Sequence, residues 1–340
     1  MEGKYLYGVT RAGEPSVRDV AGPGGSRPVY TVAHNGLRCV LSHYSGPDFA
    51  SLPREGLVHS LLAHQMVVEE AMKHSPVLPV KLGTLVGSDD EARDVLRQGE
   101  QVLAEALRQM ADRVEIEVAA TWDLPRALGE IASQEEFIQL KTALKAASVK
   151  QLVHTGKRVK EALDQRREAY QAQIVESLRG KALEVQPHPL LRDEMVANIA
   201  FLVERGGQGD FQRRVEELHD RFQGQLDFRV IGPLPPYSFS TVEVLRLSPE
   251  ELLEARRLLG LGDTVSRGDI KAAYRREAAR AHPDARPGLP GGDFQKVREA
   301  ANLLLAYCQA QDDGGARCSL GPQAGEGAFL VTIHRLDGRA

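Results

Sequence analysis

The sequence has no long apolar run and very few cysteines. No apolar segment approaches the roughly 20 residues that a helix needs to cross a bilayer, so we expect no membrane span. The first residues, MEGKYLYGVTRAGEP, lack the basic and then apolar layout of a secretory signal. The three cysteines, Cys39, Cys308 and Cys318, are odd in number and show no CxxC spacing. These features predict a cytoplasmic protein whose cysteines are reduced.

Neither sign of charge is in large excess. The 43 lysines and arginines, against 47 aspartates and glutamates, give a formal net charge of -4. This balance favours neither nucleic acid nor a membrane surface as a partner. Hydrophobic residues make up 42% and charged residues 26% of the 340 residues, which is typical of a soluble globular chain with two or three domains.

Motifs for catalysis, nucleotide binding and metal binding are missing. The glycine-containing segments 22–25 and 83–87 are not followed by the Lys-Ser/Thr pair of a phosphate-binding loop. His59, His64 and His74 have spacings of five and ten residues, which do not stack them on one helix face as metal ligands, so they are expected to be solvated or partly buried. No nucleophile elbow is present. We therefore expect no enzyme activity, no cofactor and no metal site.

Apolar periodicity in the first third of the chain predicts alternating strands and helices. Residues 4–10 alternate as a strand, and residues 29–33 and 37–43 form two more strands around Asn35-Gly36, a pair suited to a tight hairpin turn. A helix is predicted at 55–74 and extended chain at 75–84. A second helix, which begins with a Ser88 to Glu91 capping box, is predicted at 88–111, and a further strand at 113–122. This order predicts an α+β domain over residues 1–124.

A second α+β domain is expected over residues 125–245. Its long proline-free segment at 134–180 is helical in propensity. A strand at 194–203, a helix at 209–225 and a strand at 227–231 follow. The basic residues of the long helix are interleaved with glutamates further on, which favours a solvated face over RNA binding. Cys39, within a strand, is expected to be a small core residue, and Trp122 is expected to pack in a core or on a sheet rather than to bind a ligand.

Four segments in the first 245 residues share the pattern of one protein family. They are Tyr5-Leu6-Tyr7-Gly8, VLPVKLGT at 77–84, the strand from Val114 to Trp122, and GPLPPYSF at 232–239. Together and in this order they resemble the GvpL/GvpF family of gas vesicle proteins. The resemblance implies two α+β domains of modified ferredoxin-like character. It also implies an accessory cytoplasmic protein of gas vesicle assembly that binds the small hydrophobic shell protein. Lys81, Leu82 and Leu234 depart from the residues common in the family.

The C-terminal third has its own helical pattern. Ser248 and Glu251 form a capping box around Pro249, which predicts a helix ending at Gly260. A second helix is predicted at 266–281, and a third carries apolar residues on one side from Phe294 to Tyr307. The second helix carries a stripe of basic residues beside its apolar face, formed by Lys271, Arg275, Arg276 and Arg280.

His282-Pro283-Asp284 follows directly on the second of these helices. A helical hairpin joined by an HPD loop, with a shorter helix in front, resembles a J domain, and we assign it to residues 246–310 as a small all-α module. The resemblance implies recruitment of a DnaK-type chaperone, with HPD and the basic stripe as the binding residues. Arg256-Arg257 stand where a tyrosine is usual, and Ala285-Arg286 replace the usual lysine. HPD can also occur by chance in a loop, and a helical pair can be purely structural.

Residues 311–340 are interpreted as a linker followed by a strand. Residues 311–327 are rich in glycine and polar residues, whereas AFLVTIHR at 328–335 reads as a strand. A lone strand is not stable, so we expect it to return to the edge of an α+β domain. The helical module would then be an insertion into the second domain.

The leading hypothesis is an accessory protein for gas vesicle assembly, located in the cytoplasm and at the gas vesicle. Its expected partners are the shell protein, other gas vesicle accessory proteins and a DnaK-type chaperone. One alternative is a minor structural component of the vesicle that uses the J-like fold only as a contact surface. Another is a general co-chaperone with an unrelated client domain.

Overall fold

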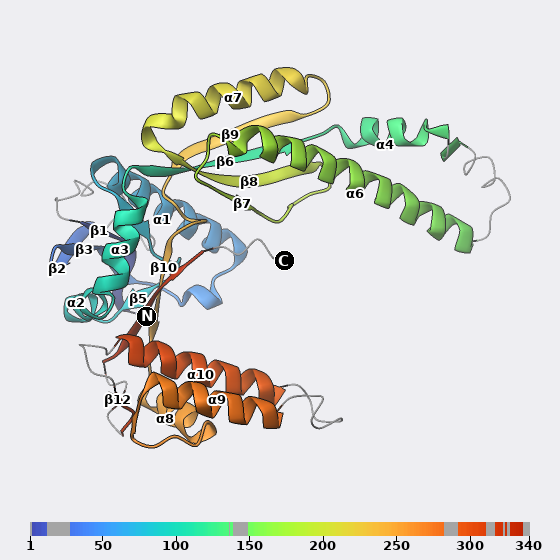
Figure 1. Cartoon of the computed structure of the whole chain (residues 1–340). Helices are drawn as coiled ribbons and strands as arrows, with labels where there is room; N and C mark the ends of the chain where they lie inside the picture. Colours follow the sequence, from blue (N-terminus) through green and yellow to red (C-terminus); the bar gives the residue numbers. More distant parts are fainter. Residues whose placement is uncertain are drawn as a thin grey trace. The chain divides into compact units, whose positions relative to one another are not determined.

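The computed structural model describes residues 2–11, 28–135, 137–138, 149–281, 292–310, 317–321, 324 and 327–335 (Figure 1). They fall into two compact units. The first comprises Met1–Gln109 with Ser240–His334, and the second comprises Met110–Phe239 with Arg335–Ala340. Among the described residues, no helix combines the length and the apolar character that crossing a membrane requires.

The first unit contains a five-stranded antiparallel sheet. Its strand order is β2-β3-β1-β4, with β5 also beside β1. The bounds are β1 (Glu2–Arg11), β2 (Tyr30–His34), β3 (Leu37–Ser45), β4 (Val77–Pro79) and β5 (Leu85–Val86). The predicted hairpin is confirmed, because β2 and β3 pair across Asn35 and Gly36, whose φ angles are 45° and 80°.

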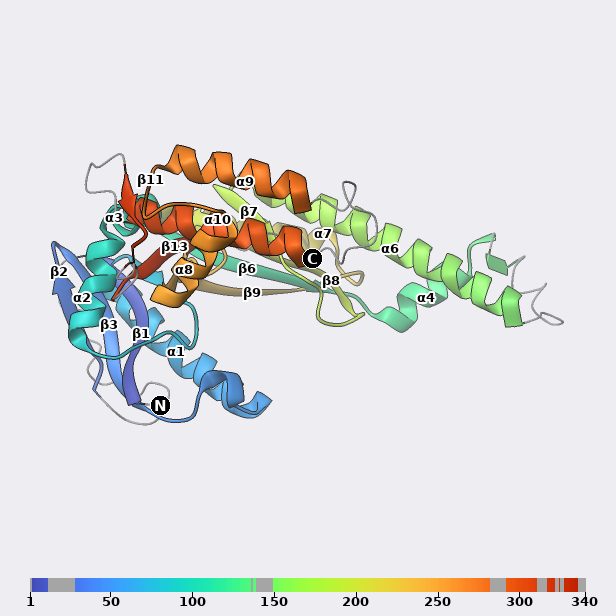
Figure 2. The same ribbon diagram turned by 90° about the horizontal axis from the view of Figure 1, so that it is seen from below.

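Helices cover both faces of this sheet (Figure 2). The 3-10 turn η1 (Phe49–Ser51) leads into α1 (Arg54–His74), which packs on the face that carries Tyr5 and Tyr7. On the other face Cys39, fully buried as predicted, touches the backbone of α2 (Asp89–Gln98). His59 and His74 are exposed, but His64 is fully buried against Tyr5, so the expectation of a solvated or partly buried side chain was wrong for His64. Burial lowers the pKa of His64 to about 4.

The helix predicted at 88–111 is two helices, α2 and α3 (Glu100–Met110), separated at Gly99. Ser88 caps α2 by accepting a hydrogen bond from the Glu91 amide at 3.2 Å, as predicted, but the Glu91 carboxylate accepts from the Gly87 amide rather than from Ser88. A Cβ at Gly99 would lie 2.8 Å from Val331 Cγ1 and 2.9 Å from Leu103 Cδ1. Glycine therefore permits the close approach of a distant strand at the point where the helix breaks.

That distant strand is β13 (Phe329–His334), which pairs along its whole length with β10 (Thr241–Arg246). β10 bridges to Val80, and the Lys81 amide donates to the Val242 carbonyl at 2.9 Å. The Phe329 amide donates to Gln98 Oε1 at 2.7 Å, which holds β13 on α2. The terminal strand therefore belongs to the first unit, and the hypothesis of an insertion into the second domain is corrected accordingly.

A helical module lies between β10 and β13. Its described residues form three helices and a two-stranded pair, namely α8 (Pro249–Leu258), β11 (Thr264–Val265), α9 (Arg267–Ala281), α10 (Gly292–Ala310) and β12 (Cys318–Ser319). The Ser248 and Glu251 capping box is present. α10 packs beside both α8 and α9 (Figure 1). Their shared core includes Leu252, Leu259, Ile270, Ala273, Val297 and Leu304. The base of the module is closed by a hydrogen bond from the Leu247 amide to the Ala328 carbonyl at 3.0 Å.

Cys308 and Cys318 differ from the expectation of reduced cysteines. The structure joins them as a disulfide, with their Cα atoms 5.4 Å apart. Both side chains lie in the core of the helical module. Most of the predicted linker at 311–327 lies outside the described residues, but its short strand β12 returns Cys318 to α10 and pairs with β11. The sequence spacing of ten residues gave no sign of this return.

The second unit is built on a four-stranded antiparallel sheet in the order β7-β8-β6-β9. The bounds are β6 (Arg113–Thr121), β7 (Glu184–Pro187), β8 (Met195–Glu204) and β9 (Asp227–Leu234). β6 was predicted as a strand but assigned to the domain at 1–124, whereas it is an inner strand of this second sheet. Alternation identified the strand, but its pairing partners are more than 70 residues away in sequence and left no local signal.

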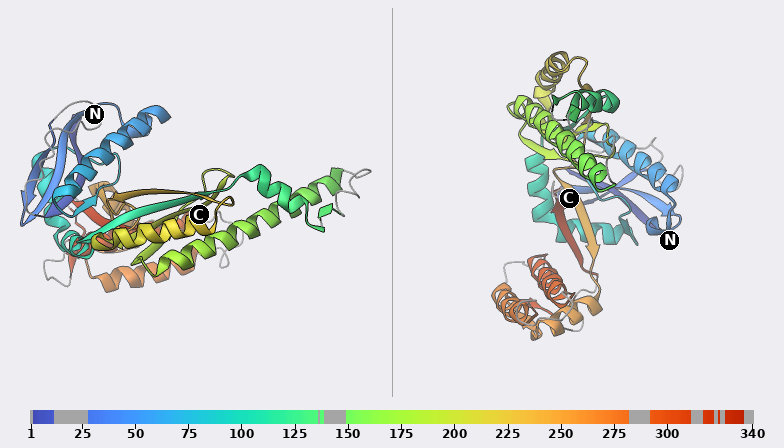
Figure 3. Two further views of the ribbon diagram at one scale, coloured as in Figure 1. Left: turned by 90° about the horizontal axis from the view of Figure 1, so that it is seen from above. Right: turned by 90° about the vertical axis from the view of Figure 1, so that its right-hand side faces the viewer.

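In the described part of the second unit, two helices cover one face of the sheet (Figure 3). They are α6 (Val149–Arg179) and α7 (Gln208–Arg221), the latter preceded by the 3-10 turn η3 (Arg205–Gly207). Trp122 is 5% exposed in this core, as predicted. The short helix α4 (Leu124–Ala132), capped by Asp123, was not predicted, and residues 136 and 139–148 of the expected long helix lie outside the described residues.

We expect Gly99→Ala to destabilise the first unit by about 1–3 kcal/mol, because the added methyl group overlaps Val331 and Leu103. Urea unfolding followed by far-ultraviolet circular dichroism measures this change. Gly262→Ala is the control, since nothing lies within 4 Å of a Cβ at that position. Equal stability of the two variants would contradict the packing of β13 against Gly99.

Candidate functional site

The basic stripe predicted in the C-terminal third lies on the exposed side of α9. Lys271, Arg275, Arg276 and Arg280 are all exposed, while Ile270 and Ala273 are buried in the module core. The helical spacing of the sequence therefore placed the cations and the apolar residues on different faces. The structure brings the four predicted basic residues together on one helix.

Two of these four cations are already engaged within the module. The Arg276 guanidinium donates to the Leu259 carbonyl at 3.1 Å and to Glu277 at 2.8 Å. Arg280 pairs with Glu277 at 3.2 Å. These contacts hold the pKa of Glu277 below its usual value, chiefly through the hydrogen bond from Arg276. Across the described residues, Lys271 and Arg275 form no ion pair, so they are the cations most available to a partner.

His282-Pro283-Asp284 lies outside the described residues, which end in α9 at Ala281 and resume at 292.

Arg256, which stands where a tyrosine is usual in J domains, has a structural role in this fold. Its guanidinium ion-pairs with Asp263 and donates to the Leu320 carbonyl at 2.9 Å. Leu320 in turn donates its amide to the Asp263 carbonyl at 2.6 Å. Arg256 thus ties α8 to the strand pair that closes the module.

A second polar cluster involves the GPLPPYSF segment of the second unit. The Ser238 amide and hydroxyl donate to the two carboxyl oxygens of Glu115, each at 2.7 Å. His188 Nε2 lies 3.0 Å from the same hydroxyl oxygen. Gly232, with φ of 141°, starts the segment, and Leu234 pairs with Glu115 in the register of β9 on β6. The segment is therefore held to β6 by strand pairing near its start and by the Ser238 hydrogen bonds near its end.

Glu115 is fully buried, and this burial raises the pKa of its carboxyl to about 7. The two hydrogen bonds from Ser238 act in the opposite direction, and the nearby Glu117 adds to the increase. Ser238 gives its only hydroxyl proton to Glu115 and is 2% exposed. A hydroxyl held in this way fastens the chain rather than attacking a substrate. Sequence analysis recognised GPLPPYSF but missed Glu115, for which the only signal was an acid within a strand.

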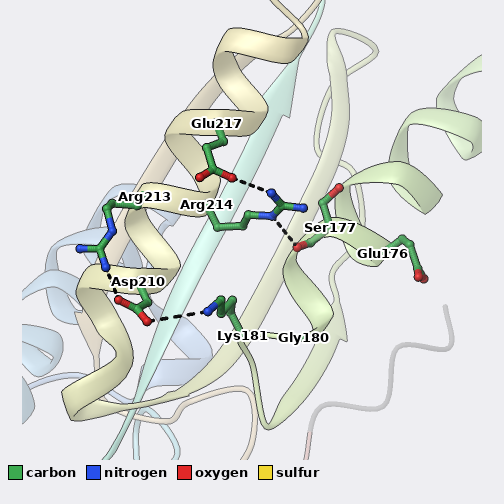
Figure 4. Close-up of a pocket in the computed structure, with 8 residues that line it drawn as sticks. All are labelled: Glu176, Ser177, Gly180, Lys181, Asp210, Arg213, Arg214 and Glu217. Carbon is green, nitrogen blue, oxygen red and sulfur yellow. Dashed lines mark hydrogen bonds and ion pairs between the residues drawn. The ribbon is translucent and has the colours of Figure 1, made fainter.

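A charged pocket lies between the end of α6 and α7 (Figure 4). Its volume is about 430 Å³, and its wall contains three basic and three acidic side chains. Lys181 and Arg213 both pair with Asp210, and Arg214 pairs with Glu217 at 2.5 Å. Arg214 also donates to the Ser177 carbonyl at 3.2 Å, which caps the C-terminal turn of α6. Because the charges balance, the pocket favours no ligand of either sign.

The described residues contain no group of three or more His, Cys, Asp or Glu side chains arranged to hold a metal ion.

The chain is similar to gas vesicle proteins over most of its length. The gas vesicle synthesis protein GvpL/GvpF family matches residues 3–241. Gas vesicle protein F of Streptomyces sp. (strain CB03234) is 33% identical over 241 residues, covering 69% of this chain and 98% of that protein. The corresponding protein of Nostoc sp. is 24% identical over 246 residues, covering 71% and 98%.

Two crystal structures share the mixed α/β fold with antiparallel sheets. GvpF from Anabaena sp. PCC7120 aligns with a TM-score of 0.59 at 22% identity, covering 70% of this chain and 95% of that one. GvpF from Microcystis aeruginosa aligns with a TM-score of 0.57 at 20% identity, covering 69% and 98%. The family match includes Glu115 and Ser238 but ends at the first residue of β10, so the module bearing α9 lies beyond it.

We expect the second unit to lose stability between about pH 5 and pH 8. The pKa of Glu115 is raised in the folded state. Its contribution to the free energy of unfolding is therefore complete below its unfolded-state pKa of roughly 4.3 and is lost as the pH rises through its folded-state pKa of about 7. The loss is on the order of 4 kcal/mol at most. Urea unfolding followed by fluorescence of Trp122, the only tryptophan of the chain, reports on this unit.

Glu115→Gln should flatten this pH dependence, because the amide does not ionise in this range. Glu168→Gln, at an exposed position of α6, is the matched control and should keep the wild-type slope. If Glu115→Gln retained the full slope, another group would be responsible and the assignment to Glu115 would be wrong.

Proposed function

The chain belongs to the gas vesicle synthesis protein GvpL/GvpF family, and from that premise we propose that it binds the hydrophobic shell protein and recruits a DnaK-type chaperone during gas vesicle assembly. Its role in gas vesicle formation follows from the family. The partners are the more specific part of the proposal. The module at 246–310 supplies the chaperone contact, and the chain performs no chemistry of its own.

Three observations support a J-like role for the module. α9 and α10 pack side by side with the shorter α8 against α10, in the order typical of a J domain. The exposed side of α9 is basic, and HPD follows α9 directly in the sequence. The basic stripe is the observation that carries the proposal, because Lys271 and Arg275 remain available for an acidic partner surface.

The proposed mechanism is electrostatic steering followed by docking of the HPD motif. Lys271 and Arg275 attract an acidic patch on the nucleotide-binding domain of the chaperone and fix its register. Asp284 pairs with an arginine of the chaperone, and Pro283 limits the conformations of the loop, so less entropy is lost on binding. ATP hydrolysis then takes place on the chaperone alone.

The α+β units provide the client side of this proposal. Each has an antiparallel sheet with helices packed on it, which supports the ferredoxin-like relationship proposed for both units. The helical module and the five-stranded sheet belong to one compact unit, so a recruited chaperone would be held close to whatever the sheet domain binds. Shell subunits with large apolar surfaces aggregate readily, which gives such delivery a physical purpose.

Two other functions are distinguished by experiment. A minor structural component of the gas vesicle would use the module only as a contact surface. A general co-chaperone would stimulate the chaperone without binding the shell protein. Capture of purified shell protein by the full-length chain separates the proposal from the second of these.

We expect the full-length chain to raise the ATPase rate of the cognate DnaK-type chaperone. His282→Gln should abolish the increase, and Arg275→Glu should reduce it by about tenfold, equivalent to about 1.4 kcal/mol, with a loss of salt dependence. Lys160→Glu, which reverses an exposed charge on α6, is the control and should leave the rate unchanged. Equal stimulation by wild type and His282→Gln would favour the structural role instead.

A further inference from the structure

Between its fifth and thirteenth residues, α1 carries an exposed apolar ridge, formed by Val58, Leu61, Leu62 and Met66. Their exposed fractions are 50%, 47%, 55% and 58%. They follow each other at intervals of three, one and four residues, so they line one side of two successive turns. Exposed apolar residues on soluble proteins are common singly, but a contiguous group of them marks an interaction site.

The ridge cannot be explained as part of the core of the first unit. The opposite side of α1 packs on the sheet through His64, Val67, Val68, Ala71 and Met72. Among the described residues, four of the twelve large hydrophobic side chains that are exposed fall on these two turns. The others, such as Leu191, stand apart from one another in the sequence, so the ridge is a local concentration rather than general surface character.

The geometry of the ridge fits a helix as its partner. The backbone groups of α1 are already hydrogen-bonded within the helix, so a partner can bind only through side chains. From Val58 to Met66 the ridge is about 12 Å long at 1.5 Å per residue, which matches two to three turns of a second helix. Residues spaced three and four apart on that helix would interdigitate with it.

The borders of the ridge determine which helix fits. Glu55 precedes it and Glu69 follows it, and both are acidic. Glu70, further round the helix, is already paired with Lys73 at 2.6 Å and with His74 at 3.7 Å. A partner whose apolar face is bordered by lysine or arginine would therefore be attracted at both ends of the ridge.

A second copy of this chain fits less well. In an antiparallel pair with its two-fold axis at Leu62, Val58 would face Met66 of the other copy. The same register places Glu55 opposite Glu69, twice by symmetry, so like charges meet at both ends. Arg54 would face Glu70, but that carboxylate already has partners.

We propose that the apolar ridge of α1 docks an amphipathic helix of the hydrophobic gas vesicle shell subunit, with basic residues bordering the apolar face of that helix. This inference rests on the proposed function and names the surface that carries out its client-binding part. Docking covers the apolar face of the subunit before it joins the vesicle wall. The ridge and the helical module belong to the same compact unit, so client and chaperone contacts are separate surfaces of one body.

The test is capture of purified cognate shell protein by the full-length chain and its variants. Leu62→Glu combined with Met66→Glu should reduce capture at least tenfold, because it places two charges in the apolar contact. Both side chains are more than half exposed, so folding should be retained and is checked by thermal unfolding. Leu191→Glu, at a position 79% exposed in the second unit, is the matched control and should capture as the wild type does.

A benzophenone amino acid at position 62 provides an independent measurement. It should cross-link to the shell protein, whereas the same group at position 191 should not. Undiminished capture by the double variant, with no cross-link from position 62, would overturn the ridge as the docking site while leaving the proposed function intact. Failure of the wild type itself to capture shell protein would overturn the proposed function as well.

Sedimentation velocity tests the other occupant. The wild-type chain should sediment as a monomer at the concentrations used for capture. A wild-type dimer that the double variant converts to a monomer would show that a second copy occupies the ridge, and would overturn the assignment to the shell subunit.

Discussion

The pairing of β10 with β13 is the interaction on which the placement of the helical module depends. All six residues of β10 have partners in β13, from Thr241 with His334 to Arg246 with Phe329. β10 is held by hydrogen bonding to Lys81 and by the ion pair of Lys81 with Glu243, and β13 is held by Gln98. The module consequently leaves the sheet domain through two adjacent strands. Two attachments restrict its orientation far more than a single flexible linker would.

The same strand pair marks where the family fold ends and the additional module begins. The family match stops at Thr241, the first residue of β10, whereas β13 lies about 90 residues later. β13 also packs against Gly99, inside the matched region. The module is therefore built into the first unit through contacts with family residues, so the proposed client binding and the proposed chaperone recruitment would be functions of one body.

Two features depart from the usual partition of polar residues outside and apolar residues inside. Glu115 is a buried carboxyl whose cost is offset by two hydrogen bonds from Ser238, and it fastens the GPLPPYSF segment to the second sheet. The apolar ridge of α1 is the reverse case, with large hydrophobic side chains left in water. The first is satisfied within the chain. The second is left exposed, and a partner that covered it would add to the apolar area buried.

The sequence by itself determined the local elements, because their signals lie within a few residues of each other. Asn35-Gly36 specified the β2–β3 hairpin, Ser248 and Glu251 specified the start of α8, and the spacing in α9 separated its cations from its core. Only the tertiary structure decided which strands pair. It assigned β6 to the second sheet, brought β13 back to β10, broke a helix at Gly99 and placed Glu115 beneath Ser238. These outcomes depend on contacts between residues far apart in the chain. Alternation and helical periodicity indicate that one face of an element is buried, but they do not indicate which other element covers that face.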